Sequence, residues 1–394
     1  MPTPTRQNRL WYRTLQNIHL WVGLILCLPL AVLGVTGSVL VFQDELRELS
    51  AEPPAHALAA GEPRSVAAIL EAAKAAAPQG MAPGMVMLPE EPGKPAMVRL
   101  SAPGRAGPGR PGGPGGSTLL IDPVSLSVLE GTPPSGSLLR QIFQLHANLL
   151  IPDRTGREVI GWLGVAMLAL GITGLVLWWP RAGRWAAAFT VKRGARGLRL
   201  HRELHGAVGI WSLAVYVVVT FSGVYLAFPQ TLNAAIGGVF PARDLRAAVK
   251  VEPVRGAAPA GVEQIVALAQ AAVPDGQLRS IMLPPRPDQA YRVNFAPPGH
   301  EHGAPMATAF VDPWAARVVE LRDPRSYSLG ETIIAWQRAL HGGEGLGWTW
   351  KILVFLSGVL PPLFAVTGTA MWLLKRRNRR AKDAERAAAR ATAG

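Results

Sequence analysis

Charge is missing from four long stretches of this sequence. Residues 18–42, 159–179, 205–228 and 352–374 contain no Asp, Glu, Lys or Arg, and each stretch is 21 to 25 residues long. A helix needs about 20 apolar residues to cross a bilayer. Because the chain is also 49% hydrophobic, with 12 Trp, it is too apolar for an ordinary soluble protein of its size. The sequence therefore predicts four transmembrane helices.

Cysteine and several cofactor motifs are scarce or absent as well. The single cysteine, Cys27, lies inside the first uncharged stretch, so no intramolecular disulfide can form. The sequence has no CxxCH motif and no Gly-rich dinucleotide fingerprint, which argues against covalent c-type haem and against bound NAD or flavin. Ion-coupled transporters usually carry carboxylates inside the bilayer. Since the four stretches contain none, transport is not expected.

Positive charge gathers beside the predicted spans. Residues 1–17, 180–204 and 375–394 together hold 18 Lys and Arg but only three acids, whereas the rest of the chain holds 22 basic and 23 acidic residues. Loops rich in Lys and Arg stay in the cytoplasm. Both termini are therefore expected in the cytoplasm and the two long segments outside, as in a multi-pass protein of a bacterial inner membrane with periplasmic domains. The expected partner of this charge is the bilayer, and no nucleic-acid partner is expected.

Two halves of the chain resemble each other. The segment "IHLWVGLILCLPLAVLGVTGSVLVF" aligns without gaps with "LHGAVGIWSLAVYVVVTFSGVYLAF", which places His19 on His205 at an offset of 186. Further matches, such as "VMLP" with "IMLP" and "ITGLVLWW" with "VTGTAMWL", follow at offsets of 190 to 195. We interpret the chain as a tandem duplication of one unit, made of a span, an external domain and a second span. The two copies are expected to be related by an axis along the membrane normal.

Each external segment shows the pattern of a small α+β layer. An Ala-rich amphipathic stretch precedes short alternating strands, "GMVMLP", "PAMVRLSA" and "STLLIDP" in the first copy and "SIMLPP", "AYRVNFAP" and "TAFVDP" in the second. The predicted order is a cytoplasmic N-terminus 1–17, span 18–42, periplasmic domain 43–137, interfacial amphipathic segment 138–158, span 159–179, cytoplasmic basic loop 180–204, span 205–228, periplasmic domain 229–328, interfacial amphipathic segment 329–351, span 352–374 and a cytoplasmic basic tail 375–394.

Four histidines recur in register through the duplication. His19 and His205 are equivalent and lie at the cytoplasmic ends of the first and third spans, while His146 and His341 are equivalent and lie on the external amphipathic segments. Under a twofold-like axis, equivalent residues face each other, so two facing pairs are expected, one near each membrane surface. Two imidazoles from opposite sides of a helix bundle suit the axial positions of a haem iron. Zinc would need two further ligands, and the spans offer no carboxylate.

Some alternatives stay open at this point. A histidine at a helix end can also be an interfacial or capping residue. His201 shares a helix face with His205 and is an alternative ligand, a propionate partner or an interface residue. Five arginines are positioned to neutralise haem propionates or to snorkel to the interface: Arg13, Arg154, Arg157, Arg202 and Arg338. Met85 and Met87 offer thioethers to copper or pack in a sheet, and "GHEHG", with His300 and His302, is a short metal-binding tract or an exposed loop.

The chain resembles the PepSY-associated transmembrane family over nearly its whole length. The residues that carry the likeness are "HLWVGL", "IDPVSLSVLEG", "LHANLLIPDRTGREVIGWLGVAMLALGITGLVLWWPR", "RLHRELHGAVGIW" and "VTGTAMWLLKRR". The family comprises iron-regulated inner-membrane proteins that include periplasmic ferric-siderophore reductases. The resemblance implies PepSY-like periplasmic domains and b-type haem, two haems in all, held by His19, His146, His205 and His341.

These features together favour an oxidoreductase of the ferric-siderophore reductase type. In this hypothesis an unknown cytoplasmic or quinol donor reduces the haem at His19 and His205, the electron passes to the haem at His146 and His341, and a ferric siderophore or another periplasmic iron chelate is reduced. One alternative is a membrane-anchored PepSY module that binds peptides or a protease without redox activity. The other is a haem subunit of another oxidoreductase.

Overall fold

The computed structural model describes residues 6–50, 58–101, 117–129 and 138–393. These residues form two compact units, and the chain passes between them several times. One unit is helical and consists of residues 6–45, 138–232 and 337–393. The other is built on a β-sheet and consists of residues 46–50, 58–101, 117–129 and 233–336.

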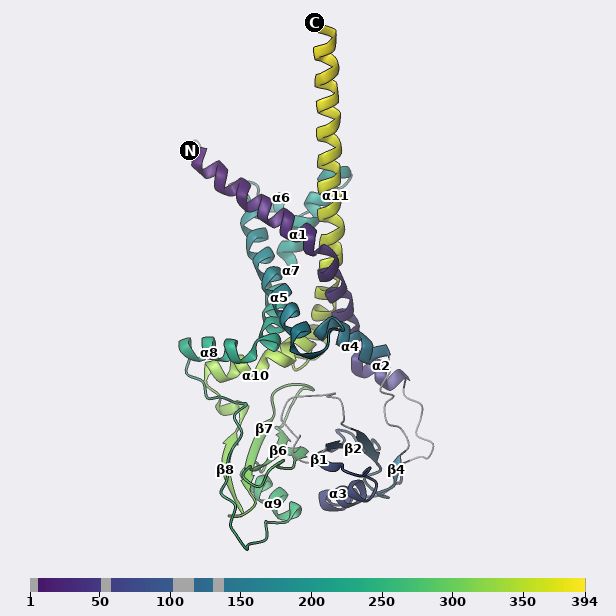
Figure 1. The fold of residues 1–394 in the computed structure, drawn as a ribbon, viewed down its shortest axis with the longest axis vertical. Helices are drawn as coiled ribbons and strands as arrows, with labels where there is room; N and C mark the ends of the chain where they lie inside the picture. Colours follow the sequence, from purple (N-terminus) through teal and green to yellow (C-terminus); the bar gives the residue numbers. More distant parts are fainter. Residues whose placement is uncertain (1–5, 51–57, 102–116, 130–137, 394) are drawn as a thin grey trace. The chain divides into compact units, whose positions relative to one another are not determined.

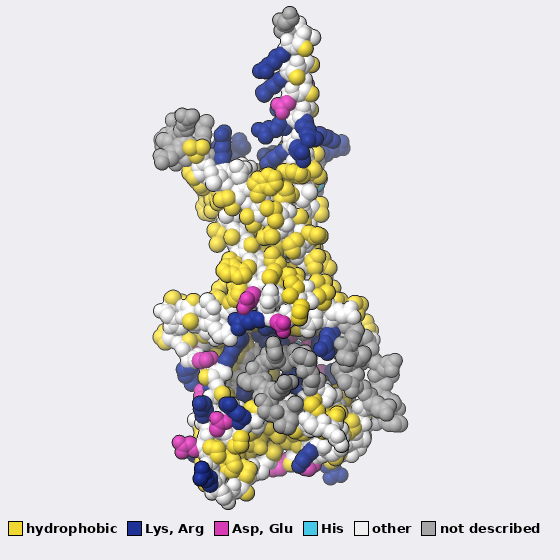
Figure 2. Space-filling model, viewed as in Figure 1, with side chains coloured by type: hydrophobic (Ala, Val, Ile, Leu, Met, Phe, Trp, Pro, Cys, Tyr) yellow, Lys and Arg dark blue, Asp and Glu magenta, His cyan; other side chains and the backbone are white. Residues whose placement is uncertain are grey.

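Four long helices make up the helical unit: α1 (Arg6–Val41), α5 (Asp153–Trp178), α7 (Gly197–Ala227) and α11 (Gly347–Ala393). Each contains a segment that is long and apolar enough to cross a membrane, namely Leu10–Val41, Asp153–Trp178, Gly197–Ala227 and Gly347–Thr392. The predicted number of spans is therefore confirmed. Hydrophobic side chains cover the outer surface of these helices, and Lys and Arg gather on α11 beyond them (Figure 2).

The helices are longer than the uncharged stretches of the sequence. α1 begins at Arg6 and α7 at Gly197, and α11 runs through the basic tail to Ala393. Lys and Arg have long apolar stems that let their charged ends reach water from a helix end. A helix therefore need not stop where its apolar stretch stops. The N-terminal end of α1 and the C-terminal end of α11 lie at the same end of the helical unit (Figure 1).

Small residues allow the long helices to approach closely in pairs. A Cβ added at Gly34 of α1 would clash with the carbonyl oxygen of Gly358 in α11, and Ser38 Oγ donates to Phe355 O at 2.8 Å across the same contact. On α5, a Cβ at Gly164 would lie 2.7 Å from Val224 of α7. Helices in membranes associate largely through such close packing. Contacts α1–α11, α5–α7, α7–α11 and α1–α5 close the bundle.

In the described residues, five shorter helices belong wholly or partly to this unit. They are α2 (Gln43–Ser50), α4 (Leu138–Asn148), α6 (Trp185–Ala188), α8 (Pro229–Val239) and α10 (Leu329–Gly342). Of these, α4 and α6 lie within it, and α2, α8 and α10 cross the division between the two units. α4 and α10 matter most here, because they directly precede α5 and α11 and carry His146 and His341. α4 ends in a tight turn in which Leu149 and Leu150 adopt left-handed backbone angles, φ 54° and 57°.

The second unit contains one eight-stranded antiparallel sheet in the order β4-β3-β2-β1-β5-β6-β7-β8. Its strands are β1 (Ala82–Met87), β2 (Ala96–Ser101), β3 (Thr118–Ile121), β4 (Val128–Leu129), β5 (Gln277–Met282), β6 (Tyr291–Ala296), β7 (Ala307–Asp312) and β8 (Arg317–Arg322). Helices α3 (Val66–Ala75) and α9 (Val262–Ala272) pack on one face and bury the core, which includes Ile69, Val86, Val98, Ile265, Ile281, Val293 and Phe295. A 3-10 turn, η1 (Pro324–Ser326), follows β8.

The two predicted α+β layers are joined in this sheet. β1 pairs antiparallel with β5, and Val86 lies opposite Ile281, its match in the "VMLP" and "IMLP" segments. Both β1–β2 and β5–β6 contain a register shift at the same relative place, at Pro83/Met85 and at Leu278/Ser280. Within the described residues the two predicted α+β layers therefore share one continuous sheet, and their division into two periplasmic domains stays a prediction. An edge strand leaves backbone groups unpaired, and pairing β1 with β5 removes two such edges.

Candidate functional site

His19 and His205 come together inside the bundle. His19 lies on α1 and His205 on α7, and their ring centroids are 6.4 Å apart with an angle of 76° between the ring planes. We call these two residues the span pair, because both belong to helical segments long enough to cross a membrane. Phe364 of α11 packs against His205 with its ring centroid 4.8 Å away.

His146 and His341 form a second pair with nearly the same spacing. His146 lies near the end of α4 and His341 near the end of α10, and their ring centroids are 6.1 Å apart at an interplanar angle of 40°. We call these residues the flank pair. His146 contacts Thr36 of α1, which lies 17 residues beyond His19 on that helix. At 1.5 Å per residue, the two pairs are about 26 Å apart along α1, close to the thickness of a hydrocarbon core.

A threonine hydroxyl fixes the protonation of each ring in the span pair. His19 Nδ1 lies 2.8 Å from Thr173 Oγ1 of α5, and that hydroxyl donates its own proton to Ala169 O at 2.8 Å. The threonine oxygen can therefore only accept from the ring, which places the imidazole proton on Nδ1. His205 has the same arrangement with Thr367 of α11, at 2.8 Å. Both rings keep Nε2 as the unprotonated nitrogen.

Backbone carbonyls add a second acceptor for each ring of the flank pair. His146 Nδ1 lies 3.1 Å from Leu33 O and 3.1 Å from Thr36 Oγ1. His341 Nδ1 lies 3.0 Å from Val219 O and 3.3 Å from Ser222 Oγ. A carbonyl oxygen accepts only, so these rings also carry their proton on Nδ1. Among the described residues, no hydrogen bond involves Nε2 of any of the four histidines.

A glycine follows each of the four hydroxyl residues and packs against the same ring. A Cβ added at Gly37 would lie 3.0 Å from His146 Cε1, and one at Gly223 would lie 2.9 Å from His341 Cε1. The corresponding distances in the span pair are 3.3 Å from Gly174 to His19 and 3.9 Å from Gly368 to His205. The helix that accepts the hydrogen bond from each Nδ1 therefore also leaves space for the imidazole, because the glycine has no Cβ to contact the ring. We call Thr36–Gly37, Thr173–Gly174, Ser222–Gly223 and Thr367–Gly368 the hydroxyl–glycine dipeptides.

Burial keeps the flank pair neutral. Desolvation lowers the pKa of His146 to about 4, and the neighbouring His341 adds to that shift. Burial also lowers the pKa of His341, with a further contribution from Arg338. Neutral imidazoles with free Nε2 lone pairs are what a metal ion binds.

The spacing within each pair suits two imidazoles on opposite sides of one metal ion. A metal–nitrogen bond of about 2.0 Å and a ring radius of about 1.1 Å, which follows from ring bonds near 1.33 Å, place the two centroids roughly 6.3 Å apart. The observed values are 6.4 Å and 6.1 Å. Ligating histidines usually donate their other N–H to an oxygen acceptor, as all four do here.

The other site residues predicted from the sequence make no hydrogen bond to these pairs in the described part of the chain. His201 precedes His205 by one helical turn, and its Nδ1 is buried without a hydrogen-bond partner among the described residues. Arg154 Nε donates to Glu158 Oε1 at 2.8 Å on its own helix, which occupies that guanidinium. The other four arginines are exposed, and of these Arg338 is near enough to His341 to affect its pKa. They are Arg13, Arg157, Arg202 and Arg338.

The hydroxyl–glycine dipeptides are functional candidates that the sequence reasoning missed. The duplication contains the signal, because "VTGSV" matches "FSGVY" and "ITGLV" matches "VTGTA". Ser or Thr followed by Gly occurs five times inside the apolar stretches, and the duplication matches four of these dipeptides in two pairs, leaving out only Ser357–Gly358. What the sequence does not supply is the geometry that places each dipeptide beside a histidine.

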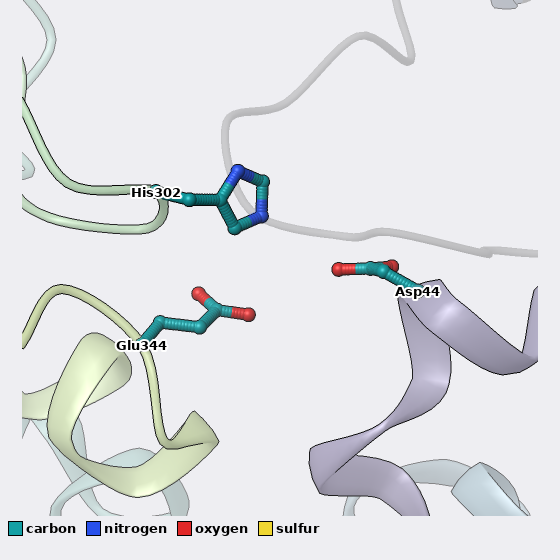
Figure 3. Close-up of side chains that lie close together, drawn as sticks. All are labelled: Asp44, His302 and Glu344. Carbon is teal, nitrogen blue, oxygen red and sulfur yellow. The ribbon is translucent and has the colours of Figure 1, made fainter. Parts of the chain in front are cut away.

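The remaining metal-binding expectations find less support. His302 Nδ1 lies 3.3 Å from Glu90 Oε2, and His300 Nε2 lies 3.0 Å from Ala304 O, within the sheet unit. Figure 3 draws His302 with Asp44 and Glu344, two residues of the helical unit whose carboxylate oxygens lie within 4.8 Å of each other. Because His302 belongs to the other unit, we assign no metal site to these three residues.

Comparison with known families places nearly the whole chain in one of them. Residues 16–375 match the model of the family described as the PepSY-associated TM region. This match covers all four histidines of the two pairs and all four hydroxyl–glycine dipeptides. A comparison with curated proteins gives no match.

Proposed function

The chain belongs to the PepSY-associated transmembrane family, and we propose that this membrane protein is a two-haem, b-type electron conduit that reduces a ferric chelate. The observation that carries the proposal is the pairing of four histidines into two sets, with ring centroids 6.4 Å and 6.1 Å apart and every Nδ1 hydrogen-bonded. The donor set fits haem better than zinc, because zinc needs four ligands and the apolar stretches supply no carboxylate.

The residues of each pair have defined tasks in this proposal. His19 and His205 would hold one haem, and His146 and His341 the other, each through Nε2. The haem supplies a one-electron redox centre with no open coordination position. The hydroxyls and carbonyls keep the proton on Nδ1 and orient each ring. Exposed arginines, Arg338 foremost, would neutralise propionates, and the apolar helices would exclude water.

The direction of electron flow follows from the proposed orientation. Lys and Arg gather at residues 1–17, 180–204 and 375–394, which supports cytoplasmic termini and a bacterial inner-membrane location. The span pair then lies on the cytoplasmic side and the flank pair on the periplasmic side. Equivalent contacts in the two halves support the tandem duplication: Thr36 contacts His146, and Ser222, at an offset of 186 from Thr36, contacts His341, at an offset of 195 from His146.

The proposed acceptor is a ferric siderophore or another periplasmic iron chelate. One-electron reduction of Fe(III) to Fe(II) weakens binding by hard oxygen donors, so the chelate would release its iron. The electron comes from a cytoplasmic reductant or a quinol. If the protein instead serves as a haem subunit of another oxidoreductase, it would co-purify with a stable partner.

A reduced-minus-oxidised absorption spectrum of the purified protein tests the proposal. We expect b-type haem bands and a ratio of two haems per chain, as measured by extraction of the porphyrin with pyridine. Single-turnover oxidation of the dithionite-reduced protein by a ferric siderophore then tests the acceptor. A colourless protein after expression with sufficient haem supply would rule out the conduit and leave a membrane-anchored PepSY binding module.

A further inference from the structure

Two arginines of the sheet unit have buried guanidinium nitrogens without a hydrogen-bond acceptor among the described residues. Arg279 Nε and Nη1 and Arg292 Nε are buried in the described part of the protein, and no described residue accepts a hydrogen bond from them. A guanidinium carries five N–H donors and is always charged. Leaving such a group buried and unpaired is costly, so a charge-bearing acceptor from outside the chain would be stabilising here.

The fold itself does not require these arginines. In the sheet register, Met282 lies opposite Arg292 and its equivalent Met87 lies opposite Met97, so Met97 takes the place of Arg292 in the first half. Arg279 occupies the irregular position between Leu278 and Ser280. The same position between Pro83 and Met85 is Gly84. The first half thus forms the same strands without either cation.

The neighbours of Arg292 are cationic, aromatic or already hydrogen-bonded. Its guanidinium lies over the ring of Phe310 at 5.8 Å, and Arg322 lies over the same ring at 4.4 Å. Arg322 is satisfied by Glu320 at 2.7 Å and by the carbonyl oxygen of Leu245 at 2.7 Å. Asn294 Oδ1 accepts from Thr308 at 2.8 Å. Burial lowers the pKa of Arg292, and the charge of Arg322 lowers it further.

Methionines border the two arginines on the same face of the sheet. Val86, Val98, Ile281 and Val293 point into the core under α3 and α9, so by strand alternation the residues next to them point to the opposite face. Leu278 also packs against the core, and the register shift that follows it places Arg279 on the opposite face as well. Met85 lies opposite Met282, and Met87 lies opposite Met97. The face therefore combines apolar thioether side chains, which adapt to irregular shapes, with unpaired guanidinium groups. We call this surface the arginine–methionine face: Met85, Met87, Met97, Met282, Arg279 and Arg292.

We propose that the arginine–methionine face binds an anionic ferric chelate, with Arg279 and Arg292 contacting its negatively charged oxygens and the methionines its apolar body. This inference rests on the proposed function and narrows the substrate class to chelates that carry net negative charge, such as tris-catecholates. A neutral tris-hydroxamate chelate gains nothing from the guanidinium groups and binds more weakly.

Binding of a redox-inert chelate tests the site without any electron transfer. The probe is the gallium(III) complex of three 2,3-dihydroxybenzoate ions, added to the purified full-length protein in a neutral detergent and measured by equilibrium dialysis. A hydrogen bond to a charged group contributes about 1.5–3 kcal/mol, so Arg292→Gln and Arg279→Gln should each weaken binding roughly 10- to 100-fold. Arg292→Lys should recover part of the loss.

The matched control is Arg317→Gln, which removes the same charge from an exposed position on β8. It should leave the affinity unchanged, and unfolding temperatures of all variants show whether each one folds. Equal affinity of the wild type and the Arg279 and Arg292 variants would overturn the proposal. So would equally tight binding of the neutral gallium acetohydroxamate complex, or displacement of the probe by phosphatidylglycerol, which would identify a lipid headgroup as the ligand.

The outcome is independent of the haem spectrum. A colourless protein that binds the gallium complex through Arg279 and Arg292 would retain the anionic-chelate site and refute the electron conduit. A red protein that binds no anionic chelate would refute the anionic-chelate site and leave the electron conduit standing.

Discussion

The span pair and the flank pair have nearly the same ring spacing but are held in different ways. In the span pair, one threonine hydroxyl is the whole support of each Nδ1. In the flank pair, a backbone carbonyl shares that task with a hydroxyl. The partners also differ in origin, because α5 and α11 support the span pair while α1 and α7 support the flank pair.

Because of this difference, side-chain substitutions should affect the two pairs differently. A hydroxyl is lost on substitution, whereas a backbone carbonyl is retained by every variant that keeps the helix. The glycines are closer to the rings in the flank pair than in the span pair. A Cβ added at the glycine would lie 2.9 and 3.0 Å from the ring in the flank pair, but 3.3 and 3.9 Å from it in the span pair. The span pair should therefore respond most to loss of a hydrogen bond, and the flank pair most to added bulk.

The largest expected effect is the loss of one haem per chain when either pair is broken. His205→Ala should reduce the haem-to-protein ratio from two to one and leave the flank pair intact, and His341→Ala should do the reverse. Each variant would remove one of the two proposed haem ligands of its pair, and the single remaining histidine would not retain the haem. The ratio and the low-spin signals in electron paramagnetic resonance measure this.

His300→Ala is the control, since the ring of this half-buried loop histidine in the sheet unit hydrogen-bonds to Ala304 O and belongs to neither pair. It should retain both haems. A ratio of two haems per chain in His205→Ala would indicate that His201, and not His205, is the ligand. Loss of both haems from every histidine variant would mean that the two pairs do not act as separate sites.

Replacing each of the four glycines by alanine should weaken haem retention to a graded extent. The added Cβ would lie 2.9 Å from His341 at Gly223, 3.0 Å from His146 at Gly37, 3.3 Å from His19 at Gly174 and 3.9 Å from His205 at Gly368. Overpacking costs roughly 1–3 kcal/mol, so Ala at Gly223 and Gly37 should weaken retention of the flank-pair haem most. Ala at Gly368 should have little effect.

Haem transfer to apomyoglobin measures retention in these variants, and Gly23→Ala is the matched control. A Cβ at Gly23 would meet only Leu170, at an ordinary 3.9 Å. If Gly368→Ala and Gly223→Ala lose haem equally, ring packing is not what distinguishes the pairs.

The apolar stretches and the strands could be predicted because their signals are local. A run of 21 or more uncharged residues needs no knowledge of its neighbours to be identified as a span, and six of the eight strands lie in the short segments that the sequence predicts as strands. β4 and β8 were missed. β4 has only two residues, and the "RVVELR" of β8 follows "TAFVDP", the last segment that the sequence predicts as a strand.

The long-range features could not be predicted with the same means. The pairing of Val86 with Ile281 joins strands far apart in the chain, and no local pattern distinguishes an internal strand β1 from an edge strand. The duplication did suggest which histidines would face each other. It could not show that Thr173 would reach His19 and not another ring, because that depends on how α5 packs against α1.

Removal of single hydroxyls should distinguish the pairs more finely. Thr367→Val and Thr173→Val leave Nδ1 of a span-pair histidine without its acceptor, and loss of such a partner typically costs about 10- to 100-fold in metal affinity. The ligand also becomes less basic, which favours Fe(II) and raises the midpoint potential of that haem.

Thr36→Val and Ser222→Ala should have smaller effects, since Leu33 O and Val219 O still accept from the flank-pair rings. Redox titration followed at the two haem signals separates the sites. Equal shifts in both pairs would show that the carbonyls do not substitute for the hydroxyls.

The smallest expected effect concerns the turns that follow the flank-pair histidines. Leu150 has a left-handed φ of 57°, whereas its match in the second half, Gly345, has φ of 80°. A side chain costs roughly 1–2 kcal/mol in that region, and Leu150 is 61% exposed, so it contributes little packing. Leu150→Gly removes this strain but also increases the conformational entropy of the unfolded chain. Because the two effects oppose each other, the unfolding temperature should rise only slightly.

The reverse change, Gly345→Leu, should lower the unfolding temperature by more, because Gly345 is buried as well as left-handed. Thermal unfolding of the purified variants measures both effects, and the haem ratio should remain two for Leu150→Gly. If Gly345→Leu is as stable as the wild type, the turn after α10 adapts freely. The position of His341 would then depend on its contacts with Val219 and Ser222 and not on the turn.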